Sequence, residues 1–367
     1  MSISPHPIQA PSSCSRPPGA GQRLRVRQER ILLAVTEHEK RTFLSEVDIP
    51  ATCLKAGAAV HETNPEKITR EYWEELLRDI RPTVLVSAWN TPPLPVAWLT
   101  EPDSSLRYVC HLAGTVRNLV PRAFLERGGL VTNWGGLIGE AVAEQALLLA
   151  LATLRKLPRW RPWITATDKQ PGLSACMALG TRSLRRRSVG IHGFGHVARA
   201  LVDLLKPFQA DVAAFSPGVP PELMRARNVV PARSPGQLAA RSEVFFECEA
   251  LTPDTAGSID ADVLDALPDN AVFVNVGRGA VVDEGALLAA ARAGRIQVAA
   301  DVLRQDPIPA DSPFLELEDA IISPHIAGPT SEQFADCGRL ALANLQKYLL
   351  GEIPESSLSL NVYDRAT

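Results

Sequence analysis

VGIHGFGHVA, at residues 189–198, carries the most specific structural signal of this chain. An apolar run typical of a buried strand leads into Gly193-Phe194-Gly195 and then into a helix-like segment that begins at His196 and Val197. This is the G-x-G-x-x-G/A pattern of a dinucleotide-binding unit, in which the first glycine allows a tight turn and the second lets the backbone approach a pyrophosphate. N–H groups at the start of the helix would bind the phosphates. Such glycines also occur where a helix merely packs on a strand, but strand, turn and helix agree here and favour binding.

Short apolar runs extend the pattern in both directions along the chain. Downstream, ADVAAF, EVFFE, AVFVNV, VAADV and AIIS are separated by helix-length segments, which predicts sequential βα units in a parallel sheet. Upstream, ILLAVT, PTVLVSA and LRYVC predict a smaller α/β unit between residues 31 and 110. Residues 138–157 and 331–350 predict two further helices, the first of them largely buried. The segment 158–187 reads as irregular.

Length and composition disfavour several classes of protein. The 367 residues suggest two domains of about 150 residues each. A formal charge of -3 provides no basic field for nucleic acid or for a membrane surface. The longest apolar run, 146–154, is far shorter than the roughly 20 residues of a bilayer-spanning helix, and the N-terminal segment lacks the apolar core of a secretory signal. Six cysteines without a CxxC pair fit reduced thiols better than disulfides or a zinc site, so we expect a cytoplasmic protein without a bound metal.

The end of the second strand bears on which dinucleotide is bound. An acidic residue about 20 positions after the glycine turn binds the ribose 2′-OH of NAD, whereas an arginine nearby accommodates the 2′-phosphate of NADP. Ser216 stands there, 23 positions after Gly193, and no arginine follows it immediately. We therefore expect NAD, with NADP possible.

Three downstream segments place polar residues just after predicted strands. Arg278 lies in NVGRGAVVDEGAL, Asp301 and Asp306 in ADVLRQDP, and His325 in ISPHIAG. Singly, each has a structural explanation, as a surface arginine, a turn-forming aspartate before proline, or a helix-capping histidine. Ligands of doubly wound sheets bind at the carboxyl ends of the strands, and an arginine, a carboxylate and a histidine converging there supply an anion clamp, an orienting charge and a proton donor.

These motifs resemble the D-isomer-specific 2-hydroxyacid dehydrogenase family, which includes phosphoglycerate dehydrogenases and glyoxylate/hydroxypyruvate reductases. The resemblance covers roughly residues 31–350 and is most specific at VGIHGFGHVA, LTPDTAG, NVGRGAVVDEGAL and ISPHIAG. It implies that Arg278 grips the substrate carboxylate and carbonyl, that Asp306 pairs with His325, and that His325 moves the proton. A carboxylate beside an imidazole favours the protonated form that a proton donor needs.

The resemblance implies further site residues and a division into domains. Asp301 would hold the nicotinamide carboxamide, and backbone N–H groups of Ala113-Gly114-Thr115 would bind the substrate carboxylate. Trp89 would line the outer pocket, although core or interface packing explains it equally well. Val276, Gly277 and Gly328 complete the expected cofactor site. The expected units are a tail at 1–29, a substrate domain at 30–132 and 329–352, an inserted NAD-binding Rossmann domain at 133–328, and a C-terminal tail at 353–367.

Several positions depart from the family pattern. Asp306 stands where a longer Glu is usual, so either the backbone lies closer to His325 or the pair is looser. The stretch 294–301 is one residue shorter than typical. Cys248-Glu249-Ala250 replaces a His-x-Pro, which places a carboxylate near the adenosine ribose, where Glu249 would repel a 2′-phosphate and partly replace the acid missing at Ser216. The substrate loop carries Arg117 where Asp is common in the family. The resemblance therefore implies the reaction type more firmly than the substrate class.

We therefore predict an α/β oxidoreductase with two Rossmann-like or flavodoxin-like domains and a cleft between them. It would transfer hydride between a nicotinamide cofactor and C2 of a small-molecule 2-keto or 2-hydroxy acid, with D-stereospecificity. The alternative is an NAD(H)-binding sensor or corepressor-like protein, or a degenerate dehydrogenase that turns over slowly. The resemblance also implies a homodimer. Residues 138–157 are a candidate interface, unless burial within the monomer explains their apolarity.

Overall fold

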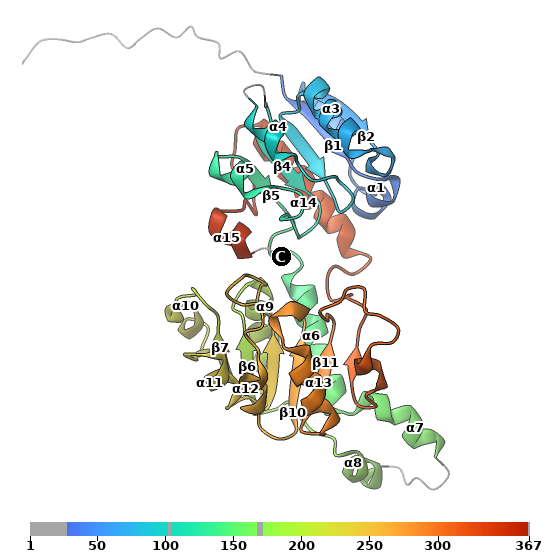
Figure 1. Ribbon diagram of the computed structural model, residues 1–367, viewed down its shortest axis with the longest axis vertical. Coiled ribbons are helices and arrows are strands. Elements are labelled where there is room, and N and C mark those ends of the chain that lie inside the picture. The colour runs from blue at the N-terminus through green and yellow to red at the C-terminus, as the bar shows by residue number, and fades with distance from the viewer. Residues whose placement is uncertain (1–27, 102–103, 167–171, 366–367) are drawn as a thin grey trace, which may run out of the picture.

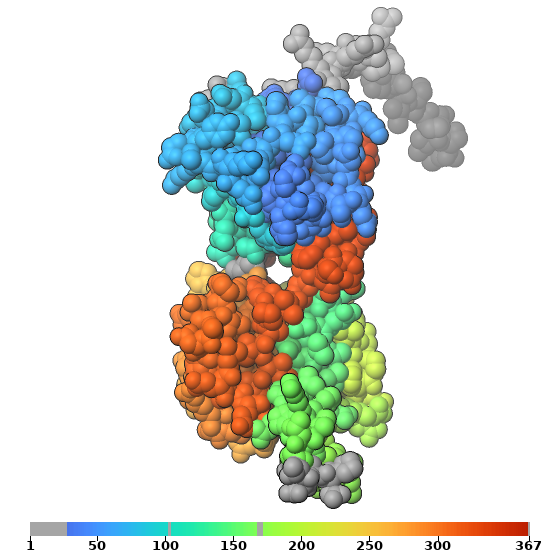
Figure 2. All heavy atoms as spheres, turned by 90° about the vertical axis from the view of Figure 1, so that its right-hand side faces the viewer, coloured from blue at the N-terminus to red at the C-terminus, as the bar shows by residue number. Residues whose placement is uncertain are grey.

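The computed structural model describes residues 28–101, 104–166 and 172–365, which form two lobes, each built around a parallel sheet (Figure 1). Residues 1–27 of the expected N-terminal tail lie outside the described residues, as does Cys14. The space-filling view shows a hollowed waist between the two lobes (Figure 2). The α/β architecture with two sheets confirms the fold class predicted from the apolar runs.

The first lobe contains a five-stranded parallel sheet in the order β2-β1-β3-β4-β5, which is the flavodoxin-like order. Apart from the partly exposed edge strand β2, its strands are largely buried, as expected for a sheet covered by helices on both faces. The strands are β1 Arg30–Ala34, β2 Ala59–Thr63, β3 Val84–Ser87, β4 Tyr108–His111 and β5 Leu130–Thr132. The helices are α1 Glu37–Phe43, α2 Ile49–Lys55, α3 Arg70–Ile80, α4 Val96–Thr100 and α5 Arg122–Glu126, with the 3-10 turn Pro65–Lys67 before α3.

The end of the described chain returns to this first lobe. Helix α14, Gln333–Leu349, packs against α1, α2 and β4. A short helix, α15, Leu360–Arg365, packs on α5 and faces the second lobe (Figure 1). The sequence did not predict α15, because six residues of mixed polarity carry no helical period.

The second lobe contains a seven-stranded parallel sheet in the order β12-β11-β10-β9-β6-β7-β8. Apart from the added edge strand β12, this is the doubly wound Rossmann order read from its far end. The strands are β6 Ser188–His192, β7 Asp211–Phe215, β8 Val230–Pro231, β9 Val244–Glu247, β10 Ala271–Asn275, β11 Ile296–Ala300 and β12 Ile321–Ile322. All six predicted apolar runs are strands of this sheet. The two-residue β8, which contains a proline, was missed.

The helices of the second lobe cover both faces of its sheet. They are α9 His196–Leu205, α10 Pro221–Arg225, α11 Pro235–Ala239, α12 Ala261–Asp265 and α13 Glu284–Arg292. Four further 3-10 turns are Leu157–Arg159, Lys206–Phe208, Gly279–Val281 and Pro313–Glu316. Helix α6, Gly139–Leu154, packs against α9, β10 and β11, so burial within the monomer accounts for most of its apolarity. The segment expected to be irregular contains two short helices, α7 Trp160–Thr165 and α8 Leu173–Leu179.

Three observations concern membrane, disulfide and metal chemistry. Within the described ranges, no helix has both the length and the apolarity needed to cross a bilayer. The five cysteines of the described chain are free thiols: Cys53, Cys110, Cys176, Cys248 and Cys337. Across the same residues, His, Cys, Asp and Glu side chains form no cluster of three or more suited to a metal ion.

Candidate active site

The glycine turn between β6 and α9 has the geometry that a dinucleotide phosphate requires. Gly193 has φ 95°, and a Cβ there would lie 2.7 Å from the backbone of Cys248 and Glu249, so only glycine fits. Gly195 caps α9 without a side-chain hydrogen bond, and a Cβ built on it meets no atom within 4 Å. The turn is therefore closed toward the protein and open at the helix N-terminus, where N–H groups and the helix dipole favour an anion.

Other predicted cofactor residues line the same edge of the second sheet. A Cβ on Gly277 would lie 3.0 Å from the carbonyl oxygen of Glu249, which packs the loop after β10 against the loop after β9. Val276 is buried and Gly328 is half-buried. His196 packs against Gly136 before α6, and burial, with help from Arg199, lowers the pKa of His196. Because that pKa is lowered, the imidazole is neutral at physiological pH.

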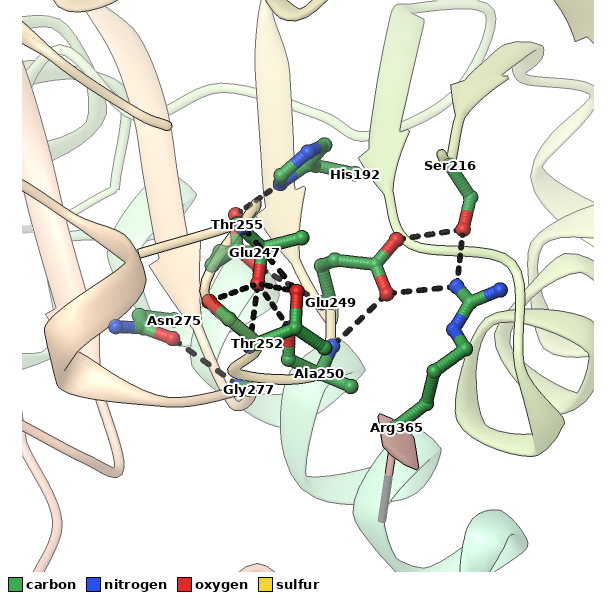
Figure 3. A network of polar contacts seen from close by, with 10 residues as sticks. All are labelled: His192, Ser216, Glu247, Glu249, Ala250, Thr252, Thr255, Asn275, Gly277 and Arg365. Carbon is green, nitrogen blue, oxygen red and sulfur yellow. Dashed lines mark hydrogen bonds and ion pairs between the residues drawn. The ribbon is translucent and has the colours of Figure 1, made fainter. Parts of the chain in front are cut away.

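A polar network links the ends of β6, β7, β9 and β10 (Figure 3). His192 Nδ1 lies 2.6 Å from Glu247 Oε2, and both side chains are fully buried. The other oxygen of Glu247 accepts from the N–H of Glu249 at 2.7 Å, so the pair fixes the loop after β9. Burial works against the charged imidazole, but the Glu247 carboxylate outweighs it and raises the pKa of His192. Burial also raises the pKa of Glu247. This pair was not singled out from the sequence, although each residue is a polar position inside an apolar run.

The network continues to the expected ribose site at the end of β7. Ser216 Oγ donates to Glu249 Oε2 at 2.5 Å, and both residues are buried. The structure thus brings the carboxylate of Glu249 beside Ser216, as the sequence departure suggested. It also brings Arg365 of α15 to the same two side chains, at 2.9 Å from each. The sequence gave no sign of this arginine, which lies 149 positions after Ser216.

Arg278, Asp306 and His325 lie on loops at the carboxyl edge of the second sheet. His325 Nδ1 is 2.5 Å from Asp306 Oδ2, so the shorter aspartate still reaches the imidazole and the pair is not loose. This contact leaves Nε2 as the ring nitrogen that can face a substrate. Arg278 follows β10; burial lowers the pKa of its guanidinium and the Asp306 carboxylate opposes that effect. Arginine remains a cation under such a shift.

Asp301 supports the loop that carries His325. Its Oδ1 accepts from Ser323 Oγ at 2.6 Å and from Ile326 N at 2.9 Å, and its Oδ2 accepts from Ala327 N at 2.9 Å. The side chain is 1% exposed. A buried carboxylate that accepts three such hydrogen bonds fixes the backbone on both sides of the histidine. The sequence had suggested only a contact with the cofactor for this residue.

The predicted substrate residues belong to the first lobe, at the carboxyl ends of β3 and β4. The bend Ala113-Gly114-Thr115 is fixed by Asn133, whose Nδ2 donates to Gly114 O at 2.6 Å. A Cβ on Gly114 would lie 2.4 Å from the ring of Trp134, so the bend has no room for a side chain there. The predicted residues therefore form two sets, one on each lobe.

Trp89 follows β3 and is 51% exposed. Its ring packs against Phe43 at 4.8 Å and against Phe334 of α14 at 5.8 Å. The residue thus takes part in an aromatic cluster and still presents about half of its surface to solvent. The packing interpretation therefore describes part of its environment, and a role in lining the substrate pocket stays a prediction.

Fold and site together define a dinucleotide-dependent oxidoreductase with two α/β lobes. The family model described as D-isomer specific 2-hydroxyacid dehydrogenase, NAD binding domain, matches residues 147–327. Glyoxylate reductase/hydroxypyruvate reductase of Mus musculus is 31% identical over 273 residues, which cover 71% of this chain and 80% of that protein. The chain belongs to the D-isomer specific 2-hydroxyacid dehydrogenase family.

Two further comparisons agree with this assignment. D-3-phosphoglycerate dehydrogenase of Methanocaldococcus jannaschii is 28% identical over 261 residues, and the match covers 71% of this chain but only 49% of that protein. A phosphoglycerate oxidoreductase from Rhizobium etli has a similar structure, with a TM-score of 0.72, 26% identity, and coverage of 90% of this chain and 98% of that one. The predicted family, oxidoreductase class and nicotinamide cofactor are thereby confirmed.

Proposed function

We propose that this protein reduces small 2-keto acids to D-2-hydroxy acids, and catalyses the reverse reaction, with Arg278, Asp306 and His325 as its catalytic residues. The observation that carries the proposal is the 2.5 Å contact of His325 Nδ1 with Asp306 Oδ2, at the sheet edge that also holds the half-buried Arg278. The named substrates of the mouse relative, glyoxylate and hydroxypyruvate, support small 2-keto acids as the substrate class.

Each of these residues has a distinct task. Arg278 binds the substrate carboxylate and polarises the C2 carbonyl, because a guanidinium presents a planar fork of donors. His325 gives a proton from Nε2 to the carbonyl oxygen, while Asp306 orients the ring and stabilises its cation. When bound, the nicotinamide supplies the hydride or accepts it. Asp301 keeps the His325 loop in place, and the N–H groups of the 113–115 bend hold the substrate carboxylate from the other lobe.

Removing the imidazole tests the proposal directly. We expect His325→Ala to lower kcat by about 10² to 10⁴, the usual scale for a lost general acid. The assay follows oxidation of NADH and of NADPH with glyoxylate, hydroxypyruvate, pyruvate and bulkier 2-keto acids. His61→Ala is the control, because His61 is exposed on the edge strand β2 of the first lobe. Near-wild-type turnover of His325→Ala would remove His325 from the mechanism.

Two other results bear on the role of Arg278 and on the rival function. Arg278→Ala should reduce kcat/KM for every 2-keto acid that the wild type accepts, and an unchanged value would contradict the assigned role. Wild-type protein that binds NADH tightly but turns over no 2-keto acid would instead support the sensor alternative.

We also propose the domain division expected from the sequence, with 30–132 and 329–352 forming the substrate domain and 133–328 the NAD-binding domain. The packing of α14 on α1, α2 and β4 supports it. Within the predicted C-terminal tail, 353–367, helix α15 packs on α5 and so extends the first lobe. The absence of a spanning helix from the described ranges is compatible with the cytoplasmic location that we propose.

A homodimer is the assembly that we propose. Its support lies in α7 and α8, which project from the second lobe (Figure 1) and on which Ile164, Leu173 and Met177 are each more than 70% exposed, because exposed apolar side chains favour an interaction surface. The double variant Ile164→Asp/Met177→Asp should run as a monomer in size-exclusion chromatography with light scattering. Leu54→Asp, at an exposed position of α2, is the control and should leave the dimer intact. A dimeric double variant would exclude this interface.

A further inference from the structure

The guanidinium of Arg365 reaches the second lobe at the point where β7 ends. Its Nη2 donates to Ser216 Oγ and to Glu249 Oε1, each at 2.9 Å (Figure 3). Ser216 Oγ in turn donates to Glu249 Oε2 at 2.5 Å. The three side chains therefore form a closed triangle of polar contacts, in which Arg365 supplies the positive charge that faces the nearly buried Glu249 carboxylate.

Helix α15 is fixed to the first lobe close to this arginine. The Tyr363 hydroxyl donates to Val120 O at 2.5 Å, and Tyr363 is 5% exposed. Arg122 Nε forms an ion pair with Asp364 Oδ1 at 2.8 Å. The two residues directly before Arg365 are thus anchored on α5 and the turn before it, so the first lobe presents the arginine to the dinucleotide site of the second.

The position of this contact determines what it can do. The residue that ends the second strand of a dinucleotide fold lies at the adenosine ribose, where an acid binds a 2′-OH and an arginine accommodates a 2′-phosphate. Here the strand ends in uncharged Ser216, and the nearby acid is Glu249, which is 3% exposed. An unneutralised Glu249 would repel a 2′-phosphate. The cation of Arg365 removes that obstacle.

Arg365 also retains donors for a ligand. Among the described residues only its Nη2 has a hydrogen-bond partner, so Nη1 and Nε remain. The side chain is 29% exposed, so part of it is accessible to solvent. Each two-donor fork of an arginine includes Nη2, which is already engaged, so Nε–H and Nη1–H point to different sides and either one can give a phosphate a single charge-assisted hydrogen bond.

We propose that Arg365 is the residue that allows this site to bind a 2′-phosphorylated dinucleotide, so that the preference for NADP(H) is set by helix α15 and not by the end of β7. The inference rests on the dinucleotide site of the proposed function and specifies its selectivity. It also gives the first lobe a direct contact with the adenosine end of the cofactor, which is remote from the nicotinamide.

Equilibrium binding without substrate tests this assignment independently of catalysis. Dissociation constants for NADPH and for NADH would be measured by fluorescence titration for wild type, Arg365→Ala and Arg365→Lys. Arg365→Ala should raise the dissociation constant for NADPH about 10- to 100-fold, the range for a lost charge-assisted hydrogen bond. The dissociation constant for NADH should stay within about 3-fold of the wild-type value. Arg365→Lys, which keeps the charge without the planar guanidinium, should give an NADPH dissociation constant between those of wild type and Arg365→Ala.

Two further variants sharpen the test. Arg241→Ala removes an arginine that pairs with Asp211 at the opposite end of β7, and it should change neither constant. Glu249→Gln removes the charge that repels a phosphate. It should lower the dissociation constant for NADPH several-fold relative to that for NADH. If Arg365→Ala tightened both dinucleotides equally, Arg365 would be a plug in the ribose site, and the inference would be wrong.

The remaining outcomes separate this inference from the proposed function. If wild type binds both dinucleotides and Arg365→Ala has the same ratio of NADPH to NADH dissociation constants, the role of Arg365 is overturned. The proposed function is unaffected by that result. Wild-type protein that binds neither overturns both.

Discussion

Replacing Asp301 with asparagine should destabilise the second lobe and also slow catalysis. The substitution keeps the size of the side chain and removes its charge. An asparagine has one acceptor oxygen, so an NH₂ group must face either Ile326 N–H or Ala327 N–H, where the carboxylate now accepts at 2.9 Å from each. The backbone that flanks His325 therefore loses at least one hydrogen bond.

The size of the effect follows from these contacts. A buried N–H left without an acceptor costs about 1 to 3 kcal/mol. The hydrogen bonds that remain, including the one from Ser323 Oγ, weaken by about 1 kcal/mol each, because their acceptor is no longer charged. Together these changes lower the free energy of unfolding by about 2 to 5 kcal/mol. Displacement of the His325 loop by a fraction of an ångström should lower kcat about 10- to 100-fold.

Chemical denaturation and steady-state kinetics on the same preparations measure both effects. Stability is measured without dinucleotide, because loss of a cofactor contact alone would not change it under those conditions. Asp311→Asn makes the same chemical change at an exposed position and should stay within about 0.5 kcal/mol of wild type. Wild-type stability together with wild-type kcat in Asp301→Asn would refute the supporting role of Asp301.

Two further predictions concern stability. Gly338→Ala should lower the free energy of unfolding by about 1 to 3 kcal/mol, because its Cβ would lie 1.8 Å from Phe43 O. Gly236→Ala, where a Cβ meets no atom within 4 Å, is the matched control, and equal denaturation midpoints for the two variants would contradict this packing. The raised pKa values of His192 and Glu247 mean that the folded state holds protons more tightly than the unfolded state. The stability that Glu247 contributes is therefore full only below about pH 4.3, whereas the stability that His192 contributes is full below about pH 6.5 and is lost as the pH rises through its folded pKa. Tm should fall from pH 6.5 to 9, with a shallower slope in Glu247→Gln; parallel slopes for the two proteins would exclude the pair as the cause.

The sequence predicted those parts of the fold that local patterns specify. Each apolar run of the second lobe became a strand, because a buried parallel strand requires a continuous apolar segment of that length. The glycine turn was recognisable because Gly193 has a positive φ that other residues rarely adopt. In both cases the physical requirement lies within about ten residues of chain.

Contacts between distant segments could not be predicted in this way. The pairing of His192 with Glu247 depends on β6 and β9 being neighbours in the sheet, although a charged residue inside VFFE was a usable signal. Arg365 offered no signal, because its partners lie more than 100 positions earlier and α15 is too short for a helical period. For Asp306, the sequence left the closeness of the pair open, and only the fold of the loop before His325 decides it.

The distribution of charge explains how a chain with a formal charge of -3 can bind an anionic substrate and an anionic cofactor. Recognition rests on placed groups, and each has its own partner. Arg278 is half-buried in the loop after β10, and Arg365 forms an ion pair with Glu249. The ion pair of Arg365 with Glu249 adds little net charge, which keeps the long-range field weak while the short-range geometry stays selective. Because the first lobe supplies both Arg365, which already contacts Ser216 and Glu249, and the 113–115 bend, one lobe contributes to the ribose end of the cofactor site and to the proposed substrate site.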